Sequence, residues 1–463
     1  MTRSRFIIAA FLLAMGQHIS AQGLHTGYFT DDYSYRHEAN PAFANDRNYV
    51  SLPGLGNINV TTMGNFGLKN VVRDNPLYPS QSDKKKTSFL NPYLSDPLKG
   101  FSKGNNIVGS EVSIAILGAG FKAFGGYNTI TVNLRADVNA KVPYELLRFA
   151  VNAGNGMYDI GDISADAQSW AELALGHSRQ VNEQWRVGAK LKFLFGLGNA
   201  SARMEDVKAQ LEGDTWRVQA QAHTDVSVKG FQYKSEAKEY EASDGTYQRV
   251  NDVDVDGYGL SGFGLATDLG AVYTPNDTWQ FSAAVKDLGF IHWSNDCYAE
   301  NPTPSFTFDG FHDMDVKGTQ PNTMDKQSDN YSDQLSQFAN LQDKGDRGGR
   351  TTGLGMTVNL GASYTLPSYK KMKFGMLSST RFISKYIRTE LRASANWTPL
   401  KWLDGGVSLA GGTYGFGCGW LLNIHPAGVN FFVGMDHILG KLSKEFIPLS
   451  SNASLTAGLS VSF

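Results

Sequence analysis

The sequence predicts an all-β protein: a closed antiparallel transmembrane β-barrel of about 14 strands (12–16), with an N-terminal plug segment and long extracellular loops. Three observations support this prediction. Many segments alternate apolar and polar residues with a period of two, as strands with one apolar face do. Short turns alternate with long polar loops. The clearest alternation reaches the last residue, where chains usually fray, so the final strand is expected to close a barrel.

Composition argues against several other classes of protein. The chain has 463 residues and a formal net charge of -2, and its mean hydropathy is -0.29. A mean hydropathy this low argues against a helical membrane protein, because transmembrane helices need long apolar runs. A near-zero net charge argues against nucleic acid as a partner. Cys297 and Cys418 are the only cysteines, so a disulfide framework is not the main source of stability. Whether these two cysteines pair stays open.

The N-terminus is typical of a secretory signal peptide. Arg3 and Arg5 precede an apolar run at residues 6–15 that is too short to cross a bilayer as a helix. Cleavage is expected after Ala21. The predicted organisation is a signal peptide at 1–21, a hatch or plug segment at 22–56 and an outer-membrane β-barrel at 57–463.

Residues 127–141 illustrate the strand pattern. Ile130, Val132 and Leu134 fall on one face, while Asn133 and its polar neighbours fall on the other. The segment is longer than the ~5–6 residues usual for strands in globular proteins, and a bilayer needs ~9–11 tilted residues. Lipid also requires closure, because an open sheet edge leaves backbone groups unpaired.

The same alternation recurs along the chain. Trp and Tyr residues near the predicted strand ends, such as Trp170, Trp185 and Trp293, are expected at the headgroup level. Turns 182–184 and 275–277 are short, whereas loops 229–256 and 291–352 are long and polar. The other predicted strands are 57–68, 107–117, 169–177, 185–197, 257–274, 278–288, 353–366, 374–382, 387–398, 405–415, 417–424 and 429–437, with weaker ones at 203–211 and 216–228.

The final strand points Leu459, Val461 and Phe463 to one side and serines such as Ser460 to the other. The first face would meet lipid, and the second would face the lumen. A strand that ends on an aromatic residue resembles the assembly signal read by the outer-membrane insertion machinery. This resemblance implies the barrel assembly machinery as a partner, and a bacterial outer-membrane location implies outer-membrane lipid and lipopolysaccharide.

Two stretches, 36–60 and 262–293, resemble a large family of Gram-negative outer-membrane barrels with an unassigned domain. That family is similar to the long-chain fatty-acid transporter barrels, in which an N-terminal hatch inside the barrel carries an Asn-Pro-Ala motif. Asn40, Pro41 and Ala42 match this motif. The resemblance implies a hatch and a hydrophobic small-molecule ligand. The glycine-rich run that usually precedes the motif is absent here.

Residues 22–56 do not alternate, so they must lie outside the barrel wall. They either plug the lumen or extend disordered into the periplasm. The segment is rich in aromatic residues, including Tyr28, Phe29 and Tyr33. Because such residues favour packing over disorder, the composition favours a plug.

Arg135, Asp137 and Arg392 fall on the predicted lumen face. They would set selectivity if the pore is open, or they form salt bridges that brace the barrel.

No cofactor or metal site is predicted. The segment that begins at Asp252 resembles the start of a calcium-binding loop, but it lacks the required Glu, since Phe263 stands at the twelfth position. The sequence also lacks a G-x-S-x-G elbow and is not expected to be an enzyme.

Two segments within the predicted loops have helical patterns. Residues 143–154 form an amphipathic helix that either caps an extracellular loop or lines an apolar access pocket with Phe149. Residues 331–341 form either a lid or a flexible surface loop.

The function expected from these observations is a passive outer-membrane channel for small hydrophobic or amphipathic molecules. The alternative is a structural or partner-binding barrel that contacts a secretion component or surface protein through loop 291–352.

Overall fold

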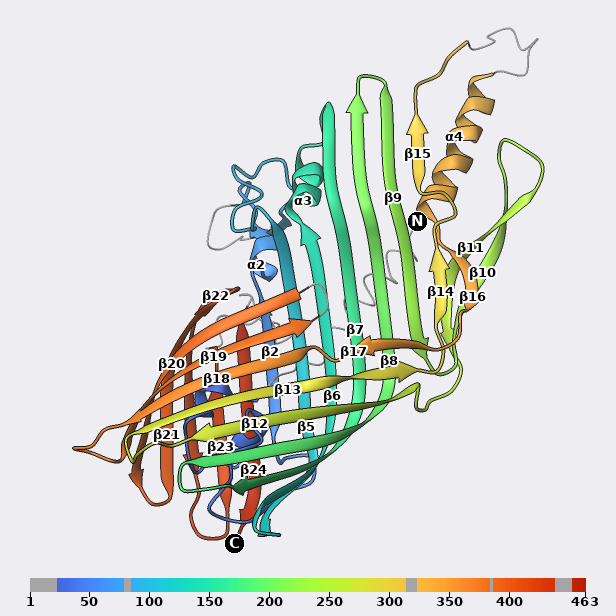
Figure 1. The fold of residues 1–463 in the computed structure, drawn as a ribbon. Coiled ribbons are helices and arrows are strands. Elements are labelled where there is room, and N and C mark those ends of the chain that lie inside the picture. The colour runs from blue at the N-terminus through green and yellow to red at the C-terminus, as the bar shows by residue number, and fades with distance from the viewer. Residues whose placement is uncertain (1–22, 79–84, 314–322, 384–385, 438–451) are drawn as a thin grey trace.

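The computed structural model describes residues 23–78, 85–313, 323–383, 386–437 and 452–463 (Figure 1). Fourteen antiparallel strands form the wall of a closed barrel. The signal peptide expected at 1–21 lies outside the described residues. In order around the wall, the strands are β2 (Ile58–Gly64), β5 (Asn105–Ala123), β6 (Gly126–Pro143), β7 (Gly156–Gln180), β8 (Trp185–Glu212), β12 (Gly262–Tyr273), β13 (Trp279–Trp293), β18 (Met356–Thr365), β19 (Met372–Ile383), β20 (Tyr386–Leu400), β21 (Leu403–Gly412), β22 (Gly415–Ile424), β23 (Asn430–Met435) and β24 (Ala453–Ser462).

The barrel closes where the last strand meets the first. Ala457 of β24 lies opposite Ile58 of β2, and Ser462 lies opposite Tyr49 of the short strand β1 (Tyr49–Ser51). The predicted fold class is therefore confirmed. The wall begins at Tyr49, earlier than the boundary at residue 57 that the sequence suggests, because β1 pairs with both β24 and β5.

The two faces of the wall differ in polarity in the predicted sense. In β24, Leu455 and Val461 are exposed, as is Phe463 directly after it, whereas Ser460 and Ser462 are buried. In β6, the polar residues from Thr129 to Asn139 are buried, and the apolar residues between them face outward. An apolar exterior around a polar interior is the arrangement that lipid requires of a barrel.

Short turns gather at one end of the barrel, and two of them are closed by an asparagine side chain. The side-chain oxygen of Asn182 accepts hydrogen bonds from the backbone of Gln184 and Trp185, each within 2.9 Å. Asn276 accepts the equivalent bonds from Thr278 and Trp279. An asparagine in this position closes a tight turn by replacing a backbone acceptor.

Exposed aromatic residues surround this end of the wall. Trp185 packs on Tyr273 with ring centroids 4.7 Å apart, and Trp279 packs on Tyr364 at 5.0 Å. Such half-exposed rings suit the bilayer interface. Trp170 and Trp293 do not lie in this belt. Both are fully buried, in a cluster with Leu194 and Ile291, because they sit on the lumen side of their strands.

At the opposite end, β7 and β8 continue far beyond the barrel (Figure 1). β8 has 28 residues, so at ~3.3 Å per residue it is about 90 Å long, about three times the ~30 Å hydrocarbon thickness. Its first half pairs with β12 in the wall, and its second half pairs with β9 (Thr215–Val228) outside it. The separate strand predicted at 203–211 is wrong: it is the outer half of β8.

Among the described residues, no helix has the length and apolar character needed to cross a membrane. The remaining elements lie in the connections at this end of the barrel. These elements are α2 (Leu68–Val71), β3 (Val72–Asp74), β4 (Lys86–Ser88), α3 (Tyr144–Val151), β10 (Phe231–Glu239), β11 (Thr246–Val255), β14 (Cys297–Glu300), β15 (Ser305–Phe308), α4 (Met324–Ala339), β16 (Gln342–Asp346) and β17 (Arg350–Gly353).

Candidate functional site in the barrel lumen

Residues 23–48, which we call the lumen peptide, lie inside the barrel (Figure 1). The Thr26 amide and hydroxyl both donate to Asp436 at 2.7 Å, just beyond β23. Tyr28 hydrogen bonds to Ser282 on β13 at 3.0 Å. Partners on strands so far apart around the wall can be reached together only from the interior. Two short 3-10 turns, η1 (His25–Gly27) and η2 (Arg36–Glu38), shape the peptide.

The aromatic residues of the lumen peptide form two packed clusters. Tyr33 and Tyr35 pack on Phe432 of β23, and Tyr28 packs edge-on against Phe29 and Phe43 at 4.8 and 5.0 Å. These rings are almost fully buried. The packing explains why this segment carries so many aromatic residues: each ring buried away from water contributes apolar area that a disordered tail would leave exposed.

The Asn-Pro-Ala motif lies against β8, β12 and β13. Asn40 is fully buried, and its amide nitrogen donates to the backbone carbonyls of Ala271 at 3.4 Å and Ala283 at 3.3 Å. Its side-chain oxygen accepts from the Ala42 amide at 2.9 Å. One asparagine side chain thus both shapes the turn at Pro41 and attaches it to the wall.

Glycines on the lumen face leave room for the peptide backbone. Gly188 and Gly270 lie opposite each other on β8 and β12. A Cβ atom on Gly188 would lie 2.6 Å from the Ala42 nitrogen and closer still to the Pro41 carbonyl. Other wall glycines stand equally close to the peptide, with a Cβ position less than 3.0 Å from it: Gly361, Gly375, Gly419 and Gly434.

The predicted lumen residues Arg135 and Asp137 both face the interior, but they belong to different ion-pair groups. Arg135 of β6 pairs with Asp287 of β13 at 2.9 Å and with Glu172 of β7 at 3.4 Å. Lys192 of β8 reaches the same Asp287 at 2.6 Å. Arg135 therefore joins strands three and seven of the wall order given above.

Asp137 belongs to an ion-pair group that crosses the whole lumen. Arg381 on β19 pairs with Asp137 at 2.8 Å and also with Glu111 on β5. Arg388 on β20 pairs with Glu111 at 2.9 Å. β5 is the second strand around the wall and β19 is the ninth, so these side chains bridge opposite walls of a barrel of fourteen strands. Direct ion pairs therefore span the lumen at this level.

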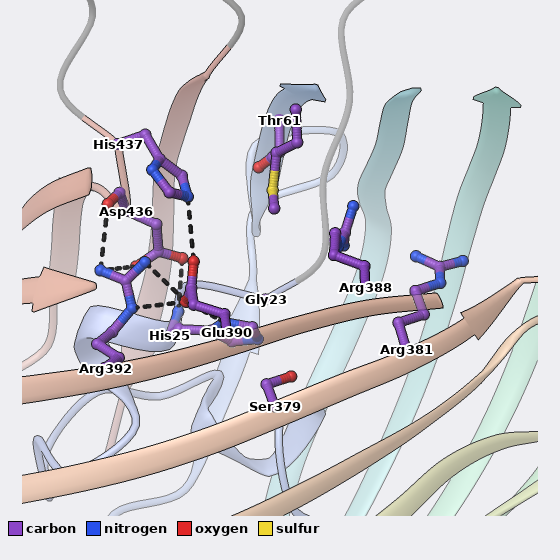
Figure 2. A pocket seen from close by; sticks show the side chains of 11 residues that line it. Gly23, His25, Thr61, Ser379, Arg381, Arg388, Glu390, Arg392, Asp436 and His437 are labelled. Atoms are coloured by element: carbon purple, nitrogen blue, oxygen red, sulfur yellow. Dashed lines mark hydrogen bonds and ion pairs between the residues drawn. The ribbon is translucent and has the colours of Figure 1, made fainter. Parts of the chain in front are cut away.

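Arg392 connects the wall to the lumen peptide. Its guanidinium lies 2.9 Å from Glu390 and 3.6 Å from Asp436. His437 also pairs with Glu390, at 3.2 Å. Figure 2 shows these side chains converging beside His25 of the lumen peptide. The three predicted lumen candidates are thus all in ion pairs, an arrangement that braces the barrel in the structure described here.

Two kinds of cavity lie on either side of the lumen peptide. At the short-turn end, a cavity of about 650 Å³ is lined by Arg36 and Phe43 of the peptide and by Lys122 and Arg186 of the wall. Beyond the peptide, the cavity shown in Figure 2 has only about 20 Å³ because the ion pairs fill it. The lumen peptide therefore lies between a cavity of about 650 Å³ and the group of ion pairs shown in Figure 2.

The two loop helices pack on the extended strands. Phe149 of α3 contacts Tyr158 of β7 edge-on, with ring centroids 5.0 Å apart. Phe338 of α4 packs against the same apolar cluster. The helix predicted at residues 143–154 is present as α3, and its role as a cap or as the lining of an access pocket stays a prediction. Cys297 and Cys418, whose pairing the sequence left open, are both free thiols in the structure.

A further group near the short turns has no local sequence signal. Asp32 of the lumen peptide, Asp404 of β21 and His425 after β22 lie together. Burial alone would lower the pKa of His425, but its hydrogen bond and ion pair with Asp404, and the nearby charge of Asp32, raise that pKa above its usual value. The three residues come from distant parts of the chain, so only the fold brings them together.

Comparisons with known proteins place the chain in a family. Curated proteins give no match. Among solved structures, the P. putida toluene transporter TodX is similar with a TM-score of 0.39 and 9% identity over 92% of each chain. A Pseudomonas aeruginosa FadL homologue has a TM-score of 0.35 and 9% identity over 97% of this chain and 96% of that one. The model of a family of unknown function, DUF5723, matches residues 41–436, so this protein belongs to that family.

Proposed function

We propose that this protein is a gated outer-membrane channel for the passive diffusion of small amphipathic molecules, and that the lumen peptide is its plug. The observation that supports the proposal most directly is the polar lumen itself. A barrel of about eight strands fills its interior with side chains, whereas larger barrels leave space inside. Here that space holds the lumen peptide, which packs against glycines and polar residues of the wall.

The composition of the lumen favours amphipathic over purely hydrophobic solutes. The route past the lumen peptide is lined by charged side chains such as Arg135, Asp287 and Arg381. Moving a molecule with no polar groups past them would separate these ion pairs without offering them hydrogen bonds in return. A solute with one polar end can satisfy these groups while its apolar part passes the aromatic residues of the peptide.

The outer-membrane location in this proposal rests on the apolar exterior and the interfacial Trp residues described above. Outer-membrane lipid and lipopolysaccharide would contact that exterior, and the barrel assembly machinery would insert the protein.

Single-channel conductance of the refolded mature chain in a planar bilayer tests the proposal. The wild type should be silent for most of the recording, with rare openings. Asn40→Ala removes the contacts that Asn40 makes with Ala271 and Ala283, so openings should become more frequent. Asn276→Ala, which alters a turn outside the lumen, serves as the control. If folded Asn40→Ala barrels stay as silent as the wild type and pass no solute in a liposome-swelling assay, the lumen is not a gated path.

The second candidate function is a platform for a protein partner, and the extended strands favour it. The outer half of β8 and all of β9 stand beyond the barrel wall, and β14 and β15 add to the same sheet. A channel alone does not require such a structure. Cross-linking from Met157→Cys, at a position 71% exposed on β7, would capture a stable partner in intact cells if this surface is an interface, with Cys297 and Cys418 first replaced by serine. Recovery of uncross-linked protein only would exclude this site as the contact.

A further inference from the structure

Three potential metal ligands meet where the lumen peptide touches the wall near the short turns. Asp32 belongs to the peptide, Asp404 lies at the start of β21, and His425 follows directly after β22. His425 Nε2 lies 3.1 Å from Asp404 Oδ1 and 3.9 Å from Asp32 Oδ2. One donor atom from each residue lies within 4.8 Å of the other two. Asp404 and His425 are buried, and Asp32 is half-buried.

Two asparagines hold Asp32 and Asp404 in position. The side-chain amides of Asn423 and Asn430 both donate to the backbone oxygen of Asp32, at 3.1 and 3.3 Å. Asn423 also donates to both carboxylate oxygens of Asp404, at 3.3 Å each. Partners of this kind orient the ligands of protein metal sites and tune their affinity. The peptide backbone is therefore fixed at the point where its carboxylate faces the wall.

A cavity of about 20 Å³ lies beside two of the three residues and is lined by Asp32, His425 and Asn430, among others. It has room for one water molecule or one ion. Asn430 is 3% exposed, and its side-chain oxygen has no hydrogen-bond partner among the described residues. A buried amide oxygen of this kind needs a donor or a cation.

We propose that Asp32, Asp404 and His425 bind one divalent transition-metal ion of the zinc type, and that this ion ties the lumen peptide to the barrel wall. One imidazole and two carboxylates form a donor set that Zn²⁺ accepts, with bonds of about 2.0–2.2 Å. A tetrahedron with such bonds places its donor atoms about 3.3–3.6 Å apart. The distances from His425 Nε2, 3.1 Å to Asp404 and 3.9 Å to Asp32, lie on either side of this range. The Asn430 oxygen or a water takes the fourth position.

A bound divalent cation would also offset the negative charge around the three residues. Asp32, Asp404 and the neighbouring Asp46 carry three negative charges, while Arg47, whose guanidinium donates to the His425 carbonyl at 3.1 Å, carries one positive charge. A divalent cation offsets this excess and uses the histidine as a ligand.

Titration of the purified, tag-free mature protein with Zn²⁺ after EDTA treatment tests the binding. We expect one Zn²⁺ per chain. Asp32→Asn keeps the backbone contacts of residue 32 and removes only its charge, and it should weaken binding about 100-fold or more. His425→Ala should do the same, whereas His177→Ala, which alters an exposed histidine on β7, should not. No bound Zn²⁺, or binding unchanged in Asp32→Asn and His425→Ala, would overturn the assignment.

Hydrogen exchange tests whether the ion anchors the lumen peptide. With free Zn²⁺ at about ten times the Kd, opening of the peptide should be suppressed about tenfold. Amides 28–36 should therefore exchange about tenfold more slowly, and EDTA or Asp32→Asn should abolish the effect. Equal exchange with and without bound Zn²⁺ would refute the anchoring role. Neither readout depends on conductance, so failure of the channel proposal would leave this inference standing.

Discussion

Gly188→Ala should open the barrel by displacing the lumen peptide. The added methyl would lie 2.6 Å from the Ala42 nitrogen, nearly 1 Å inside normal contact. Overpacking of this size costs about 1–3 kcal/mol. The lumen peptide should move rather than the wall, because β8 is held on both sides by hydrogen bonds to β7 and β12. Alanine is itself better than glycine in a strand interior, so the barrel should remain folded.

An energy of about 1–3 kcal/mol against the seated peptide changes the ratio of open to closed channels about 5- to 150-fold. Single-channel recording measures this ratio directly as open probability. Gly154→Ala is the matched control, because a Cβ at that position meets no atom within 4 Å. Both variants must first show the same heat-modifiable mobility in electrophoresis. If Gly188→Ala then opens no more often than Gly154→Ala, the peptide does not close the lumen by this contact.

Two other perturbations have distinct expected results. Arg381→Met leaves Asp137 buried without its cation and should lower the free energy of unfolding in urea by about 3–5 kcal/mol. Lys86→Met, which removes a surface ion pair, should cost less than about 1 kcal/mol, and equal losses would contradict the argument. Removal of Phe463 should slow assembly in cells, measured as the fraction of heat-modifiable protein, if the terminal aromatic strand is the assembly signal; an unchanged fraction would reject that role.

The sequence predicted the wall well because lipid imposes a pattern on it. Within the bilayer, one face of each strand must be apolar, so alternation marks residues 185–197 of β8. Beyond Leu197, both faces of the strand can be polar, and the alternation fades although the hydrogen bonds continue to Glu212. The sequence therefore divided one strand into two. The pattern reports contact with lipid more faithfully than it reports strand length.

The lumen was only half predictable, for a different reason. Arg135, Asp137 and Arg392 could be assigned to the interior because they alternate with apolar residues. Their partners could not be assigned, since Arg381 lies 244 residues from Asp137 along the chain. The pairing depends on barrel circumference and strand register, and neither leaves a local trace in composition. The group of Asp32, Asp404 and His425 was missed on the same grounds.

The lumen peptide and the ion pairs above it form one structure rather than two separate barriers. Asp436 accepts two hydrogen bonds from Thr26 of the peptide and also faces Arg392, which is itself held by Glu390. Hydrogen bonds to a charged group are worth about 1.5–3 kcal/mol each. Withdrawal of the peptide therefore leaves Asp436 with fewer donors and changes the field at Arg392. Loosening the ion pairs in turn weakens the hydrogen bonds between Asp436 and Thr26. Movement of the lumen peptide and rearrangement of the ion pairs should therefore occur together.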